Sequence, residues 1–287
     1  MVYILISILS LSGIFVVFKI AEKKQLSVIN IIVVNYLFAA LIGTIQSGVN
    51  PLMMFSQDWF FMAFLIGLLF FVSFVIIGVS TKLVGLSITT VAAKMSTVIP
   101  IIFSIIYFSE QLSILKVLGV LIAVIGVVLT VYKPNSKDSK KVNIYEIIIP
   151  LLLFIGMGTS DSLVKFSQHS YLNSSNIALF NSSLFYISLI SSLVYVVVTK
   201  NIKGLFNNKI WLYGSVLGVL NFYGVFFFIK ALDSKIFDSS IIFGINNVGI
   251  VSLSVLIGLF LFKEKLLNIN KIGVAISILA IVILSQA

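Results

Sequence analysis

The stretch SITTVAAKMSTVIPIIFSIIYF, residues 87–108, is an apolar run with one charged residue, Lys94, inside it. A helix of about 20 apolar residues is long enough to cross the hydrocarbon core of a bilayer. Similar runs recur along all 287 residues, of which 60% are hydrophobic and only 10% charged. Soluble domains contain about 25% charged residues. The sequence therefore predicts an all-α integral membrane protein.

Apolar runs, separated at clusters of Lys, Asn, Pro and Gly, predict ten transmembrane helices. We expect them at 2–20, 27–47, 58–79, 86–108, 114–132, 144–166, 174–199, 210–230, 237–262 and 267–285. The first run is interpreted as a retained helix and not a signal peptide, because its lysines follow the apolar segment instead of preceding it.

Matching residues predict that the chain is duplicated and that the two copies meet at the polar stretch YKPNSKDSKKVN. We expect a first five-helix repeat at 1–133, a polar linker at 134–143 and a second five-helix repeat at 144–287. Matching pairs support this division: FSEQL with FKEKL, Gly119 with Gly273, Lys19 with Lys165, Asn30 with Asn176, and Asn35 with Asn181. Five is an odd number, so the two copies must enter the membrane from opposite sides. The prediction is an inverted repeat, an architecture found in many secondary transporters.

The distribution of positive charge agrees with ten helices. All 19 basic residues are lysines, and most of them border alternate loops on one predicted side of the membrane. Four lysines lie instead on the opposite predicted side: Lys116, Lys165, Lys230 and Lys235. Because cytoplasmic loops carry the excess of Lys, we expect a multi-pass protein of the plasma or inner membrane with both termini outside the cytoplasm.

Two segments resemble the end of an EamA-type repeat of the drug/metabolite transporter superfamily. They are residues 87–129 and 239–284, each with small and polar residues, a Glu after the helix, and a last helix rich in Gly and Val. The resemblance extends over both halves and implies a ten-helix exporter or exchanger of small metabolites. The second copy has Ser254 where such repeats usually have Pro, so hinge behaviour is expected to differ between the halves. Well-known relatives are drawn with both termini cytoplasmic, in conflict with the charge-based orientation.

Lys94 is the main candidate for substrate binding. A central Lys costs roughly 2.5–3.5 kcal/mol on membrane-insertion scales, and this position is about 12 Å into its predicted helix. Pro100 removes a backbone donor, which leaves the Ser96 carbonyl without its helical partner and suggests a hinge. Ser96 and Thr97 add hydroxyl groups. Such a broken, polar segment can bind an anionic group; the alternative is a structural lysine paired with a carboxylate or backbone carbonyls.

Asp161 and Lys165 are candidates for ion coupling. They are spaced to share one face of a helix. They either neutralise each other as an intrahelical pair or provide a proton carrier at Asp161. For Lys165, an anchor of its helix end is a further alternative. Asp161 and Lys94 correspond to Phe15 and Val248 in the other half. Polar residues present in only one half are not required by the shared scaffold, which favours a role in binding or coupling.

Further polar positions complete the predicted substrate site. Asn35 and Asn181 fit either hydrogen bonding between helices or substrate contact. Asn221, Tyr223, Asn246 and Asn247 are expected as pocket walls. Glu110 and Glu264 are interpreted as caps of the helices that follow them, and Trp59 and Trp211 as interfacial aromatic residues.

The expected function is secondary transport, by alternating access, of small metabolites carrying a carboxylate or phosphate, with amino-acid-like compounds favoured. A multidrug exporter of hydrophobic cations is the alternative. The chain has no Cys and one His, and its acidic residues are dispersed, so we expect no enzyme activity, metal or cofactor. The expected partners are a small-molecule substrate and the lipid bilayer. We expect no nucleic acid, and a monomer.

Overall fold

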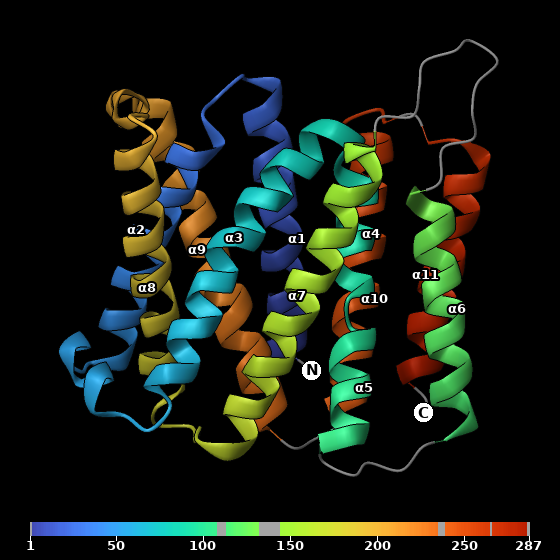
Figure 1. Cartoon of the computed structure of the whole chain (residues 1–287), viewed down its shortest axis with the longest axis horizontal. Helices are drawn as coiled ribbons and strands as arrows, with labels where there is room; N and C mark the ends of the chain where they lie inside the picture. The colour runs from blue at the N-terminus through green and yellow to red at the C-terminus, as the bar shows by residue number, and fades with distance from the viewer. Residues whose placement is uncertain (1, 108–112, 132–143, 235–238, 265, 286–287) are drawn as a thin grey trace. The chain divides into compact units, whose positions relative to one another are not determined.

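A computed structural model gives the structure of the protein and describes residues 2–107, 113–131, 144–234, 239–264 and 266–285 (Figure 1). Within these ranges the chain forms helices joined by short turns, and no strand. Glu110 and the predicted linker at 134–143 lie outside the described residues.

The chain divides into two compact units, and each contains helices from both sequence halves. One unit is Met1–Gly78 with Leu163–Phe237, and the other is Val79–Ser162 with Asp238–Ala287. The boundaries fall within two long helices, α3 (Phe60–Val84) and α7 (Tyr145–Ser170). The sequence repeats predicted at 1–133 and 144–287 therefore do not coincide with the compact units.

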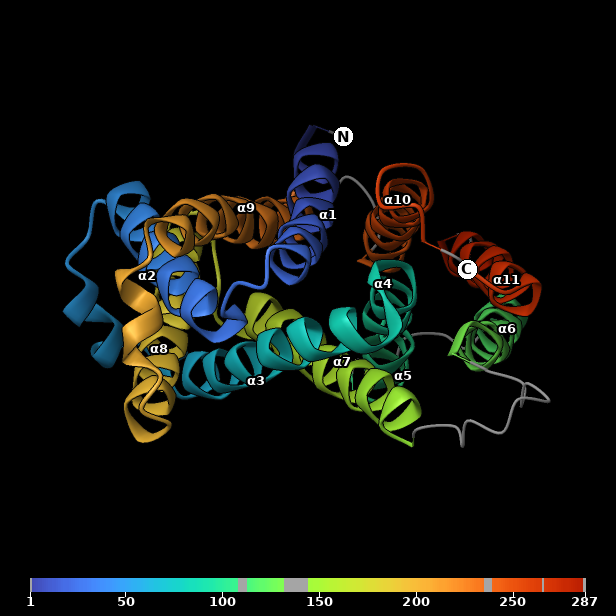
Figure 2. The same cartoon turned by 90° about the horizontal axis from the view of Figure 1, so that it is seen from above.

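The first unit contains four complete long helices and the adjoining parts of α3 and α7. The complete helices are α1 (Val2–Lys23), α2 (Val28–Ser47), α8 (Ile177–Val198) and α9 (Asn208–Asp233). Two short 3-10 helices, η1 (Pro51–Ser56) and η2 (Ile202–Phe206), connect them. Helix α2 packs against α8 and α9, and α9 packs against α1 (Figure 2).

Glycine residues allow the helices of the first unit to approach closely. A Cβ atom at Gly218 of α9 would lie 2.6 Å from the backbone oxygen of Asn35 in α2. A Cβ atom at Gly67 of α3 would lie 2.8 Å from the Leu184 oxygen in α8. Membrane helices commonly meet at such small residues, because van der Waals packing replaces the hydrophobic effect between them.

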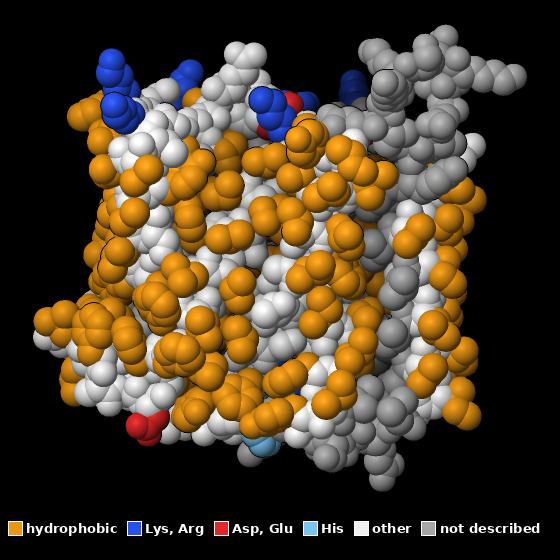
Figure 3. Space-filling model, viewed as in Figure 1, with side chains coloured by type: hydrophobic (Ala, Val, Ile, Leu, Met, Phe, Trp, Pro, Cys, Tyr) orange, Lys and Arg blue, Asp and Glu red, His pale blue; other side chains and the backbone are white. Residues whose placement is uncertain are grey.

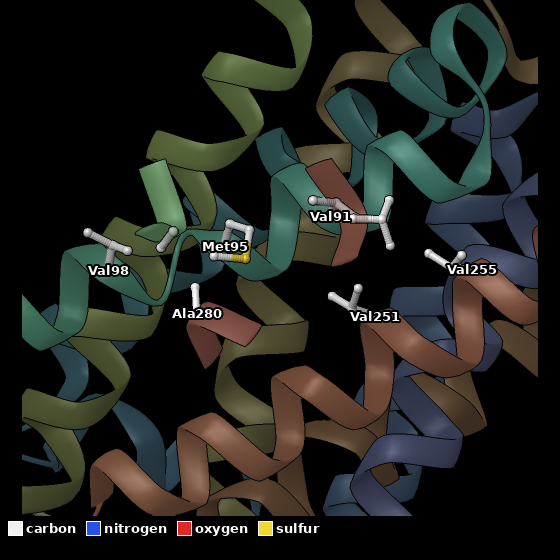
Figure 4. Packing of buried hydrophobic residues seen from close by; sticks show 8 residues of the cluster. Val91, Met95, Val98, Val251, Val255 and Ala280 are labelled. Carbon is white, nitrogen blue, oxygen red and sulfur yellow. The ribbon is translucent and has the colours of Figure 1, made fainter. Parts of the chain in front are cut away.

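The second unit is built around α4 and α10. Its helices are α4 (Leu86–Met95), α5 (Val98–Tyr107), α6 (Ile114–Val131), most of α7, α10 (Ser239–Phe260) and α11 (Asn268–Ser285). Helix α11 packs along α6 and also contacts α10, and α10 contacts α4. Figure 4 shows the apolar centre of this unit, where Val91 and Met95 of α4 lie near Val251 and Val255 of α10.

The helices lie where the sequence predicts them, with one difference: the fourth predicted span is two helices, α4 and α5. Among the described residues, seven helical stretches are long and apolar enough to cross a membrane, and one of them, Leu86–Phe103, runs from α4 into α5. Many large apolar side chains are exposed; Ile45, for example, is 82% exposed. On the face drawn in Figure 3, hydrophobic side chains cover most of the described helices. Together these features indicate a multi-pass membrane protein.

The two tryptophans do not share the interfacial environment predicted for them. Trp211 is 44% exposed and its indole nitrogen donates to the Leu205 carbonyl at 2.8 Å. Trp59 is only 2% exposed and packs edge-on against Phe180. The prediction for Trp59 is therefore wrong, because the first unit folds over its ring and removes it from the lipid-facing surface.

Candidate functional site

The candidate site surrounds the break between α4 and α5. Helix α4 ends at Met95 and α5 begins at Val98, with Ser96 and Thr97 between them (Figure 1). Pro100 lies in the first turn of α5, where its missing N–H does not interrupt an established helical hydrogen bond. The expected helix break is therefore present, and it lies just before the proline. Helix α10 continues unbroken through Ser254, so the two halves differ in the way the sequence predicts.

Hydroxyl groups satisfy the carbonyls at the break. The Ser96 hydroxyl donates to the Ala93 carbonyl at 2.5 Å, and the Thr97 hydroxyl donates to the Lys94 carbonyl at 2.9 Å. The Ser96 carbonyl has no helical partner at Pro100, as the sequence predicts, and accepts instead from the Ile99 N–H at 2.9 Å. One tighter turn thus replaces the helical bond that Pro100 cannot make. The break is thus stable without a bound ligand to complete its backbone.

Lys94 is buried at the end of α4, with 6% of its surface exposed. A cation in the last turn of a helix is favoured by the partial negative charge of the helix C-terminus. The ammonium group also interacts electrostatically with the carboxylate of Asp161 on α7, and both residues belong to the second unit. The structure therefore supplies the carboxylate partner that the sequence considered for Lys94 without identifying it.

Gly158 allows Asp161 to face the break. A Cβ atom at Gly158 would lie 2.8 Å from the Ser96 carbonyl oxygen and would also contact the side chain of Ile99. Helix α7 can therefore pass close to the break only at a residue without a side chain. Asp161 lies three positions later, on the same face of α7. This contact explains how a residue remote in sequence comes near Lys94.

Helix α10 adds two amides to the site. Asn246 and Asn247 are 2% and 3% exposed. The Asn247 amide donates to the Thr97 hydroxyl, which links α10 to the break. The Asn246 side-chain oxygen is buried without a hydrogen-bond partner among the described residues. An unpaired buried acceptor is costly, so this oxygen is available to a polar ligand.

The remaining predicted site residues belong to the first unit. The side-chain amides of Asn221 and Asn35 lie 3.2 Å apart, and the Asn181 amide donates to the Phe222 carbonyl at 3.3 Å. These contacts agree with hydrogen bonding between helices. Tyr223 is half-buried and its ring packs against Phe222 and Phe227. Lys165 is 7% exposed, which fits an interior group better than a lysine anchoring a helix end.

Glu264 has a role that the sequence predicted only in part. Its carboxylate accepts from the N–H groups of Leu86 and Ser87 at 2.7 and 3.1 Å, and from the Ser87 hydroxyl at 2.8 Å. It therefore caps a helix N-terminus, as expected of its residue type. The capped helix is α4, however, and not the helix that follows Glu264. Sequence spacing alone could not reveal this, because the contact joins distant segments.

The charged groups of the site suit a polar ligand better than a metal ion. Over the described residues, no group of three or more His, Cys, Asp or Glu side chains is placed to hold a metal. Lys94 offers a cation and Asp161 an anion. A small molecule that carries an anionic group can interact with Lys94 in competition with Asp161.

Comparisons with known proteins agree with the fold and do not reveal the activity. No protein-family model matches the chain. A Haemophilus influenzae protein, described only as uncharacterized, is 28% identical over 286 residues, covering 97% of this chain and 95% of that protein. A protein of known crystal structure is similar with a TM-score of 0.65 and 14% identity, covering 99% of this chain and 96% of that one. At this identity the likeness shows the fold alone.

Proposed function

We propose that the protein is a secondary transporter that exports or exchanges small metabolites bearing a carboxylate or phosphate. The observation that carries the proposal is the buried Lys94 at a helix break, beside Asp161 and the amides of α10. Charged residues within membrane segments are costly and mark substrate or ion pathways. Broken helices with polar groups at the break are typical of transporter binding sites. Amino-acid-like compounds are the favoured substrates.

Helix packing supports an inverted repeat of two five-helix halves, and thus the EamA-type resemblance. Three of the predicted counterparts pack against each other: α2 with α8, α4 with α10, and α6 with α11. The close contact of α9 with α2 at Gly218 has a counterpart in the contact of α3 with α8 at Gly67. Packing of equivalent helices about a common axis is expected of two related halves. We therefore interpret the ten predicted spans, with α4 and α5 as one, as a complete transport unit.

The carboxylate of Asp161 within the apolar helix α7 favours the second candidate, a multidrug exporter of hydrophobic cations. A carboxylate within a membrane segment can bind a cation directly. Lys94 lies close enough to interact with this carboxylate, and a cationic substrate would have to compete with it. The positive charge of Lys94 therefore favours anionic over cationic substrates.

Counterflow into liposomes tests the proposal. The purified protein would be reconstituted and offered phenylalanine, leucine, glutamate, citrate, glucose 6-phosphate and tetraphenylphosphonium in turn. We expect saturable exchange of at least one compound with a carboxylate or phosphate, and a rise of about tenfold or more in its KM in Lys94→Gln, as loss of a bond to a charged group implies. Lys82→Gln is the matched control, because it removes the same charge from an exposed position at the end of α3. Exchange of tetraphenylphosphonium alone would instead favour the multidrug exporter.

A further inference from the structure

We propose that α10 and the turn after it hold α4 at both ends, and that Glu264 and Asn247 are positioning residues for Lys94. The holding contacts involve only the second unit and do not depend on the activity. Their consequence for substrate affinity rests on the proposed function, in which Lys94 binds the anionic group.

The first contact is at the start of α4. Gly85, with φ of 91°, turns the chain into the helix, and the Glu264 carboxylate accepts three hydrogen bonds from Leu86 and Ser87. Charge-assisted hydrogen bonds of this kind are about twice as strong as neutral ones. Two glycines leave room for the carboxylate: a Cβ atom at Gly85 or Gly258 would lie 3.0 or 2.9 Å from its oxygens. The half-buried Glu264 carboxylate thus fits against the helix N-terminus.

The second contact is at the other end of α4. The Asn247 amide of α10 donates to the Thr97 hydroxyl, and this hydroxyl donates to the Lys94 carbonyl. The amide of one helix thereby supports the backbone of the lysine in another. Between the two ends, Val91 and Met95 pack near Val251 and Val255 (Figure 4).

These contacts join α4 to α10 and to the turn after α10, both before and after Lys94 in the sequence. Helix α4 has only ten residues, which is short for a helix that must hold its own position. Because the break follows Met95 directly, α5 can change its direction without moving Lys94. The backbone that carries Lys94 is therefore held by Glu264, in the turn after α10, at one end of α4 and by Asn247 of α10 at the other.

Hydrogen–deuterium exchange of the amides in 86–97 tests the holding contacts directly. We expect Glu264→Gln and Thr97→Val each to accelerate exchange there by about threefold to tenfold, as loss of a hydrogen bond implies. Thr97→Ser keeps the hydroxyl and should restore slow exchange. The control for Glu264→Gln is Glu22→Gln, which removes a carboxylate that pairs with Lys19 at 3.0 Å in the first unit. Unchanged exchange in both variants would refute the holding contacts. If Glu264→Gln does not fold, Ser87→Ala removes one of its bonds and serves the same purpose.

A double-mutant cycle tests the consequence for Lys94, using the panel compound that wild type exchanges. We expect Thr97→Val and Glu264→Gln to raise KM about threefold to tenfold, with little change in the maximal rate. In the Lys94→Gln background, each should have no further effect on KM. Full additivity would refute positioning while leaving the holding contacts intact. A failure of Lys94→Gln to change transport would instead refute the proposed function. Hydrogen–deuterium exchange of the amides in 86–97 would still decide whether the holding contacts exist.

Discussion

Lys94 at the end of α4 and Asp161 in the middle of α7 interact electrostatically within one compact unit. In the repeat that the sequence predicts, their counterparts are the apolar residues Val248 and Phe15. Each charge partly offsets the cost of burying the other. Their interaction also means that a substrate anion at Lys94 must compete with the protein's own carboxylate.

Removal of either charge should destabilise the protein more than removal of both. Removal of one partner from a fully buried pair lowers the free energy of unfolding by about 3–5 kcal/mol. Because Asp161 is partly exposed, we expect a smaller loss of roughly 1–3 kcal/mol for each single variant. Thermal unfolding in detergent would compare Lys94→Gln, Asp161→Asn and the double variant. The double variant should unfold at a higher temperature than at least one single variant. Independent, additive effects would show that the two charges do not interact.

Asp161 also has a direct test as the coupling group. If a proton on Asp161 drives net transport, uptake by Asp161→Asn should no longer respond to an imposed pH gradient, while counterflow exchange should persist. Asp58→Asn is the matched control, because Asp58 is exposed and lies in the first unit. A pH dependence identical to that of wild type would exclude Asp161 as the coupling group.

The sequence predicted the helices and the break more completely than the site. Apolar length is a local property, so the position of each helix could be read directly. The break at Ser96–Thr97 was also local, since Pro100 lies beside it. The partnership of Lys94 with Asp161 and the cap that Glu264 provides for α4 depend on how distant helices pack. Neither could be derived from spacing along the chain.

The predicted site residues also divide between the two compact units. Lys94, Thr97, Asp161 and Asn247 come together in one unit, whereas Asn35 and Asn221 pair in the other. The sequence marked all of them as polar residues in apolar helices. The sequence could not distinguish the polar residues that hydrogen-bond to each other from those whose polar groups have no partner within the described part of the protein. Only the contacts make that distinction, as for Asn246, whose buried oxygen has no partner among the described residues.

Gly158 should tolerate no side chain. In Gly158→Ala, the new Cβ atom would lie 2.8 Å from the Ser96 carbonyl oxygen, so α7 must move away from the break. We expect a loss of about 1–3 kcal/mol in the free energy of unfolding. We also expect slower substrate exchange in counterflow, because Asp161 moves with the helix. Ser162→Ala is the control: its hydroxyl donates only to the Gly158 carbonyl of its own helix in the described contacts. Equal unfolding temperatures for Gly158→Ala and wild type would contradict the close approach.

Asn221 should contribute to stability and not to substrate affinity. Its amide lies 3.2 Å from that of Asn35 between α9 and α2, and such contacts in membrane proteins average about 0.6 kcal/mol. We expect Asn221→Ala to lower the unfolding temperature by a few degrees and to leave KM in counterflow unchanged. A selective rise in KM without loss of stability would restore Asn221 to the substrate site that the sequence predicted.

The distribution of lysines predicts the orientation in the membrane. In the first unit, the end of α1 and the start of α9 lie at the same end (Figure 1), and the Lys24 ammonium is 5.4 Å from the centre of the Tyr213 ring. Because cytoplasmic segments are rich in Lys, this end should face the cytoplasm and the N-terminus should lie outside. The natural chain has no Cys, so single cysteines can be labelled selectively. A membrane-impermeant maleimide should label Asp58→Cys in intact cells and Lys203→Cys only after permeabilisation. The reverse pattern would place both positions on the opposite sides and agree with the orientation usual for EamA-type relatives.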